Sequence, residues 1–451
     1  MKAVNRNILS HVKRNLSAQA ARKTTEASSS AQPAKVSQLP NGAVVASVEN
    51  YSPITRLSVI YKAGARYEHH HALGASHCIR IASNLSTKNC SSFGLVKNIQ
   101  QIGGVFGCST SRDHMIYNME FLRGHVDVGA EFLGHASTGP AFKHWEVHDV
   151  QPRLNVDLAV LNEQPVTQLI EHLHTAAYKS GLGRSLFAPS FMVGHYSPEM
   201  LQDFVSHNFT SGRMAIVGVG VDHDVLVERA KEFYTPVAGG GSSAEKTKYR
   251  GGEARIDTIS EFAHVALVSE GAALNTKEAL ALGVVQQALG CGQHIKYGSN
   301  TASSKLNQAA VAVTNNPISA SCFNVNYSDS GLFGFIVSGQ GEDMGKVLPA
   351  LVAQMRAVSK SGIDEADITR GKNQLKANLH MSIETGTGLV EEMAVQAITT
   401  GKITTIEEIS QAIDSLTSTD INNIAKKVIT GKASMAAIGD LATTPFLDEL
   451  V

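Results

Sequence analysis

The sequence predicts an α+β protein made of two duplicated halves, each a largely antiparallel sheet covered by helices. Two pairs of similar segments indicate the duplication. Residues 197–218 align without a gap with residues 418–439, and both have the pattern of a helix, a turn and a strand. Residues 117–132 match residues 334–348 in type, as an alternating strand, a glycine turn and an amphipathic helix. The spacings of 221 and 217 residues are nearly equal, which favours duplication over chance similarity.

The composition is that of a folded protein of two or three domains. Of the 451 residues, 43% are apolar and 18% are charged, which excludes a disordered, collagen-like or coiled-coil chain. The formal charge is −1, but residues 1–35 hold seven Lys and Arg and one acid, so the remainder carries −7. A mildly acidic body argues against nucleic acid as a partner, because phosphate binding needs a cationic face.

Residues 1–35 have the composition of a mitochondrial transit peptide followed by a spacer. Apolar residues recur at helical spacing between Val4 and Leu16, basic residues occupy much of the other surface, and the first acid is Glu26. A secretory signal fits poorly, because an uninterrupted apolar region of about 7–15 residues is lacking. The alternative is a disordered basic tail. We expect this segment to lie outside the fold.

The cysteines and the apolar runs limit the compartment and the topology. The five cysteines are far apart, form no C-x-x-C pair and leave an odd one, so neither a disulfide framework nor a zinc ribbon is indicated. This pattern is typical of a reducing compartment. Apolar stretches such as residues 279–289 are bounded by charge before reaching the roughly 18 residues of a membrane span. The chain is not expected to cross a bilayer.

The rest of the chain is expected to divide at a linker. Residues 236–254 are rich in Gly, Ser and charge and lack an apolar period. The predicted N-terminal domain therefore spans residues 36–235, and the C-terminal domain spans residues 255–451. Alternating strands such as 57–62 and 322–327 predict sheets with one face covered by helices.

Several segments resemble a known family. Residues 39–68, followed by LGASHCIRIASNLSTKN, resemble the opening of the pitrilysin-type metallopeptidases with an inverted zinc motif and of their non-peptidase relatives. The resemblance continues through residues 290–304, residues 323–335 and the segment SMAAIGDLATTPFLDEL. These last three segments are most similar to the core subunits of the mitochondrial ubiquinol–cytochrome c reductase, complex III. The resemblance implies two metallopeptidase-like halves.

The family's zinc motif falls on one short stretch of this chain. In active members, a helix after the first strands carries H-x-x-E-H, whose two His bind zinc and whose Glu is the general base. Positions i, i+3 and i+4 share one helix face, so all three side chains point at one ion. By resemblance these positions are His77, Arg80 and Ile81, and a carboxylate ligand from a later helix falls on or near Asp157.

The substitutions predict a vestigial zinc site. Ile81 has no lone pair, and Arg80 is a permanent cation that cannot deprotonate water. At about 4 Å from a divalent ion, a guanidinium would cost on the order of 8 kcal/mol at an effective dielectric near 20. His77 and Asp157 alone fall short of the three protein ligands that a catalytic zinc usually has. We expect no catalytic residue, metal or cofactor in this chain, and a charge pair between Asp157 and either His77 or Arg80.

Other histidines are weaker candidates for a metal site. The run of residues 68–71, Glu-His-His-His, suggests a metal, but successive side chains point in different directions. His144 and His148 have the i, i+4 spacing of a chelating pair, but a third ligand is not evident. His172 and His174 would diverge on a helix. A solvated surface role is the expectation for the first two groups.

The glycine clusters and the haem motifs add no site. Residues 239–241 and 290–292 fit neither common phosphate-loop pattern. By resemblance, the second cluster lies where the processing-peptidase relatives carry a glycine-rich loop that handles presequences, and here the loop is interrupted by QHIKY. A C-x-x-C-H haem attachment motif is absent from the sequence. The chain is expected to carry no electrons itself.

The resemblance implies a structural subunit of complex III. Such a subunit would pair with the related core protein 1 and with other complex III subunits, in which the haem and iron–sulfur centres are expected. It would lie on the matrix side of the mitochondrial inner membrane, peripheral to it, and meet a second copy of itself through dimerisation of the complex. The alternative is the non-catalytic, presequence-recognising alpha subunit of the mitochondrial processing peptidase. A third reading, an active metalloendopeptidase, requires a zinc set that residues 77–81 do not provide.

Overall fold

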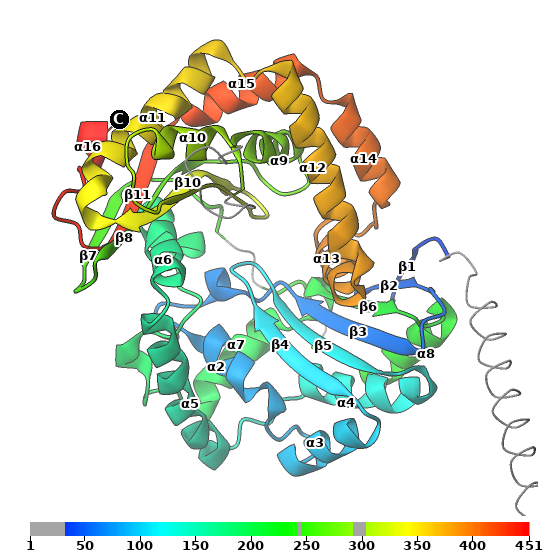
Figure 1. The fold of residues 1–451 in the computed structure, drawn as a ribbon. Coiled ribbons are helices and arrows are strands. Elements are labelled where there is room, and N and C mark those ends of the chain that lie inside the picture. The colour runs from blue at the N-terminus through cyan, green and yellow to red at the C-terminus, as the bar shows by residue number, and fades with distance from the viewer. Residues whose placement is uncertain (1–31, 238, 242–244, 292–303, 451) are drawn as a thin grey trace, which may run out of the picture.

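The fold has two mixed sheets with helices packed against both, which confirms the predicted α+β class (Figure 1). The computed structural model describes residues 32–237, 239–241, 245–291 and 304–450. The predicted transit peptide lies outside the described residues up to residue 31. Strand β1 begins at Lys35, the last residue of the predicted spacer. Within these described ranges, helices that combine the length and the apolar character of a membrane span are absent.

The first sheet has six strands in the order β1-β2-β6-β3-β5-β4, antiparallel except for the β2–β6 pair. The strands are β1 Lys35–Gln38, β2 Val44–Val48, β3 Ile54–Tyr61, β4 Val105–Thr110, β5 Met115–Leu122 and β6 Met214–Val219. The helices of this half are α2 Ala75–Ile81, α3 Ser92–Gln101, α4 Val126–Thr138, α5 His144–Asn162, α6 Pro165–Tyr178, α7 Pro198–Asn208 and α8 His223–Phe233.

The second sheet has five strands in the order β7-β11-β8-β10-β9, antiparallel except for the β7–β11 pair. The strands are β7 Glu253–Asp257, β8 Phe262–Glu270, β9 Ser319–Asn326, β10 Gly331–Gln340 and β11 Ala433–Gly439. The helices are α9 Lys277–Leu289, α10 Lys305–Val311, α11 Met344–Ser361, α12 Glu365–Glu384, α13 Gly386–Thr400, α14 Ile406–Ser415, α15 Ser418–Ile429 and α16 Leu447–Leu450.

The segments that the sequence pairs form equivalent elements in the two halves. Strand β5 leads through a short 3-10 turn into α4, as β10 leads into α11. Helix α7 leads into β6, as α15 leads into β11, and both helices have side-chain caps. Ser197 accepts a hydrogen bond from the Met200 amide, and Thr417 forms a capping box with Asp420. The two halves therefore share local sequence signals as well as topology.

Each sheet receives a helix from the other half of the chain, so the expectation of only one covered face is wrong. Helix α6 packs on β8 and β11, and α13 packs on β3 and β6 (Figure 1). In β3, Tyr61 faces the core of its own half, whereas Ile60 faces α13. From Leu57 to Tyr61 both alternate sets of side chains are therefore buried, because the exchanged helix removes the second face from water.

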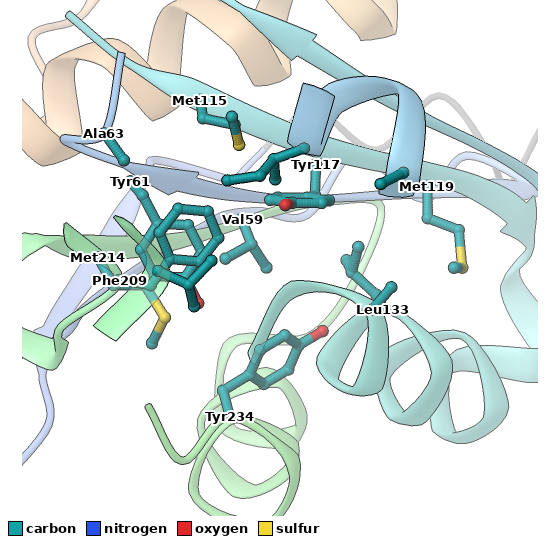
Figure 2. Close-up of a cluster of buried hydrophobic side chains, with 14 of the residues drawn as sticks. Val59, Tyr61, Ala63, Met115, Tyr117, Met119, Leu133, Phe209, Met214 and Tyr234 are labelled. Atoms are coloured by element: carbon teal, nitrogen blue, oxygen red, sulfur yellow. The ribbon is translucent and has the colours of Figure 1, made fainter. Parts of the chain in front are cut away.

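The core of the first half is an aromatic and aliphatic cluster beneath the sheet (Figure 2). The rings of Tyr61 and Phe209 stack with centroids 4.4 Å apart, and Tyr117 meets both rings edge-on. Cys78 and Ile79 of α2 belong to the same cluster. Packing of one face of α2 into this core orients its other residues toward α5.

The predicted linker contains regular structure at its end. Strand β7 begins at Glu253, and Tyr249 donates a hydrogen bond to the Lys432 carbonyl at 3.0 Å. The Thr247 amide donates to the Asp329 carboxylate at 2.9 Å. The domain limits given above stay a prediction, because the exchange of α6 and α13 means that packing does not follow the order of the chain.

Candidate functional site

The aligned zinc-motif residues come together between α2 and α5. Asp157 on α5 accepts a hydrogen bond from Arg80 Nη2, with its Oδ2 atom 2.6 Å away, and the same oxygen lies 3.1 Å from His77 Nε2. The predicted pairing is confirmed for both partners. The carboxylate that would be offered to a metal is therefore already engaged by a guanidinium and an imidazole.

The tautomer of His77 follows from its second contact. Its Nδ1 accepts a hydrogen bond from the Ala188 amide at 3.0 Å, so in the neutral ring Nε2 carries the proton and donates to Asp157. Burial lowers the pKa of His77, and the charge of Arg80 acts in the same direction, while the hydrogen bond to Asp157 opposes them. At neutral pH His77 is a donor here, with neither nitrogen free to bind an ion.

Asp157 remains a carboxylate. Burial alone would raise its pKa, but the hydrogen bonds from His77 and Arg80 and the charge of Arg80 outweigh burial, so the pKa is lowered. Ile81, in the place of the second histidine, packs against the apolar core. The site thus pairs one anion with one cation and lacks a proton acceptor positioned to activate water. These residues do not fit a catalytic zinc ion.

Glu68 supports α2, a role that the sequence analysis missed. Its buried carboxylate accepts hydrogen bonds from the Gly74 amide at 2.7 Å and the Ser76 amide at 3.0 Å, at the start of α2. Burial raises the pKa of Glu68 to about 7, although the hydrogen bonds from Ser76 and Gly74 lower it. Gly74 has φ 78°, and a Cβ there would overlap Tyr196 and Ala188. An acid six residues before a helix is too weak a signal to reveal this supporting contact.

The other histidine candidates do not join the site. His69, His70 and His71 are exposed on a loop whose neighbour Glu68 points inward. The His148 side chain is 78% exposed on α5. His174 is buried on α6, where burial lowers its pKa to about 3.

The remaining candidates are clusters of metal-ligating side chains and the glycine-rich loop. In the part of the chain that the structure describes, groups of three or more His, Cys, Asp or Glu that could hold a metal ion are absent. The glycine-rich segment predicted around residues 290–304 lies mostly outside the described residues, which resume at Ser304.

A cavity of about 350 Å³ adjoins the Arg80–Asp157 pair. It lies between α5, the edge strand β4 and the segment after α6, and its lining includes Cys108, Val160, Leu161, Leu186 and Phe187. The Phe187 ring meets the His77 ring edge-on at 5.5 Å. A cleft therefore lies beside the Arg80–Asp157 pair, whose opposite charges neutralise one another.

The fold and the site define a metallopeptidase-like protein whose zinc motif is incomplete. Residues 44–190 match the family model described as Insulinase (Peptidase family M16), and residues 195–375 match the model described as Peptidase M16 inactive domain. The chain belongs to peptidase family M16, the insulinase family.

The relatives of this chain include subunits of the cytochrome b-c1 complex and of the mitochondrial processing peptidase. The chain is 42% identical to cytochrome b-c1 complex subunit 2, mitochondrial, of Homo sapiens over 93% of this chain and 92% of that protein. The identity to the Rattus norvegicus protein of the same name is also 42%, over the same shares. It is 28% identical to a probable mitochondrial-processing peptidase subunit alpha-1 of Arabidopsis thaliana, over 92% of this chain and 84% of that protein.

Proposed function

We propose that this chain is a non-catalytic structural subunit of mitochondrial complex III, of the core-2 type. The observation that carries the proposal is the similarity along nearly the whole chain to subunit 2 of the cytochrome b-c1 complex, which is well above the similarity to the processing-peptidase subunits. The chain is a peptidase homologue without peptidase activity. It contributes to an oxidoreductase as a scaffold.

The geometry of the cleft supports the absence of catalysis. Metalloprotease chemistry needs three ligands on the metal and a general base beside the bound water. Here Arg80 stands in the place of the base, and its guanidinium binds the carboxylate of Asp157. Hydrolysis would require removing that ion pair and supplying a further ligand.

A scaffold role fits the rest of the molecule. Stable subunit contacts bury roughly 1,200–2,000 Å² or more, and a two-sheet protein of this size offers such surfaces. We assign core protein 1 and other complex III subunits as its partners, with the haem and iron–sulfur centres held by them and no cofactor in this chain. A second copy would be met through dimerisation of the complex. The subunit would sit peripherally on the matrix side of the inner membrane after removal of a leader within residues 1–35.

Co-purification tests the proposal. Mitochondria are extracted with a mild detergent, the complexes are separated by native electrophoresis, and this chain is located by mass spectrometry. We expect it to migrate with haem-containing subunits of a b-c1 complex. Recovery with a soluble activity that cleaves presequences, free of haem, would instead support the alpha subunit of the processing peptidase and overturn the complex III proposal.

A further inference from the structure

The helices and sheets pack into two bodies. Each body contains one helix from the other half of the chain. Body A contains the first sheet, helices α2–α5, α7 and α8, and the exchanged helix α13. Body B contains the second sheet, helices α9–α12 and α14–α16, and the exchanged helix α6. Each of the four clusters of buried apolar residues lies wholly within one body. Among the described residues, the junction of the bodies thus lacks a buried apolar cluster of its own.

A buried arginine occupies this junction. Arg66 follows β3 in body A, and its side chain is 3% exposed. Its Nη1 atom donates to Asp113 of the same body at 2.7 Å. Its two terminal nitrogens donate to the two carboxylate oxygens of Asp329, at 3.1 Å and 2.9 Å, in the β9–β10 turn of body B. One guanidinium therefore holds carboxylates from both bodies.

The same guanidinium also holds the segment that connects the bodies. Nη2 of Arg66 donates to the Glu245 carbonyl at 3.2 Å and to the Thr247 hydroxyl at 3.0 Å. The Thr247 amide in turn donates to Asp329. Across the junction, the Ser328 amide donates to the second oxygen of Asp113 at 2.9 Å. Three segments far apart in the sequence thus share one network.

The chemistry of this network depends on arginine. A planar guanidinium can bind a carboxylate through two parallel hydrogen bonds and still donate in other directions, whereas an ammonium acts as a single point. A second buried pair, Arg112 with Glu171 of α6 at 2.9 Å, spans the junction nearby. Interfaces between domains permit relative motion unless they are large and apolar. At this junction, polar contacts rather than a core oppose such motion.

We propose that Arg66 is a latch that fixes body A against body B, so that this junction sets the relative position of the two sheets. Its loss loosens the junction while leaving both cores folded. The Arg80–Asp157 cleft adjoins the same region, because Leu186, which lines the cleft, donates its amide to Glu171 of α6.

Hydrogen exchange on the full chain tests the latch. In Arg66→Ala, we expect the amides of residues 245–249 and 327–331 to exchange at least tenfold faster, with β3 and β8 unchanged. Arg66→Lys should give a smaller increase, because an ammonium cannot bind both Asp329 oxygens and the linker together. The matched control is Arg123→Ala, which removes an arginine pair with Glu49 that lies within body A.

Spin-label distances give the second measurement. Labels at exposed positions Lys97 of α3 and Glu407 of α14 report across the bodies, with the partly exposed Cys90, Cys108 and Cys291 replaced by Ser. We expect a broader or longer distance distribution with the Arg66→Ala substitution than without it.

Two results would overturn the proposal that Arg66 fixes body A against body B. One is unchanged exchange at the junction together with unchanged distances in Arg66→Ala. The other is an equal acceleration in β3, β8 and the junction, which would make Arg66 a general support of the fold. If Arg66→Ala does not fold, Arg66→Lys and Asp329→Asn decide by the same two criteria.

Discussion

Helices α2 and α9 hold equivalent places in the two halves, between a central strand and an edge hairpin, but they are stabilised differently. Helix α2 has seven residues and lacks a side-chain cap at Gly74. It carries Arg80, which forms an ion pair with Asp157. Helix α9 has thirteen residues, is capped by Thr276 and has mostly buried apolar side chains. The same architecture therefore carries a polar cleft in one half and a continuous core in the other.

The comparison of α2 with α9 distinguishes features that the fold requires from polar groups that belong to the cleft. In the second half, apolar packing and the Thr276 cap hold the helix at this place. The first half keeps a buried Glu68 and an engaged Asp157, which cost desolvation and need partners. We conclude that the polar groups around α2 are remnants and supports of a cleft rather than requirements of the architecture.

The largest expected effect is a gain of zinc binding in the first half only. The double substitution Arg80→Glu with Ile81→His restores the H-x-x-E-H spacing on α2, with Asp157 nearby as a third ligand. We expect binding of one Zn²⁺ with a Kd of about 1 μM or tighter, which corresponds to roughly 8 kcal/mol. Isothermal titration calorimetry measures it.

The controls for zinc binding are the wild-type chain and the double variant with His77→Ala added. Neither should bind stoichiometric zinc. A tight ion in the wild-type chain that is lost on replacing His77 would contradict the interpretation of a vestigial site.

The next effect in size concerns the core of the second half. Phe335 of β10 is 1% exposed, and Phe335→Ala should lower the free energy of unfolding by about 3–5 kcal/mol, through lost transfer energy and a cavity. Urea unfolding followed by circular dichroism measures the change. Phe191→Ala, at a 67% exposed position in the first half, is the control and should change it by less than about 0.5 kcal/mol. Equal losses would show that burial does not distinguish these positions.

Many elements of the two halves, and part of the candidate site, could be predicted from the sequence. Strand alternation and the repeated segments are local signals, and they placed β5–α4, β10–α11, α7–β6 and α15–β11. A pairing of Asp157 with either His77 or Arg80 was also predicted, because helix geometry puts positions i and i+3 on one face and the resemblance supplies the partner helix. The structure shows both contacts.

The missed features all depend on contacts distant in sequence. An amphipathic pattern shows that α6 and α13 have an apolar face, but not which sheet that face covers. Arg66 lies in a short 3-10 turn after β3, and its partner Asp329 is 263 residues away. Glu68 was grouped with the histidines that follow it, although its carboxylate turns inward to α2. Local periodicity carries no information on such partners.

The third effect is a pH dependence that belongs to the first half. Burial raises the pKa of Glu68 to about 7, so the folded state binds a proton that the unfolded chain releases near pH 4.5. The stabilisation from this proton is complete below that pH and is lost as the pH rises through 7. Glu68→Gln removes it. We expect the unfolding free energy of the variant relative to wild type to rise by on the order of 3 kcal/mol between pH 5 and pH 8.

Urea unfolding of wild type and Glu68→Gln at several pH values makes this measurement. The comparison variant is Glu407→Gln on α14, which replaces an exposed carboxyl of the second half. A difference between Glu68→Gln and wild type that stays constant with pH would contradict the raised pKa of Glu68.

The smallest effect is expected at the Arg80–Asp157 pair itself, although it is the feature that ends zinc binding. The two side chains are 30% and 35% exposed, so water screens their attraction, and exposed pairs contribute about 0–1 kcal/mol. In a double-mutant cycle of Arg80→Met and Asp157→Asn, we expect a coupling energy below about 1 kcal/mol that weakens further in 0.5 M salt. A coupling of several kcal/mol, insensitive to salt, would mean that the pair is a structural replacement for the metal, and the cleft would then be as essential to the first half as the core around α9 is to the second.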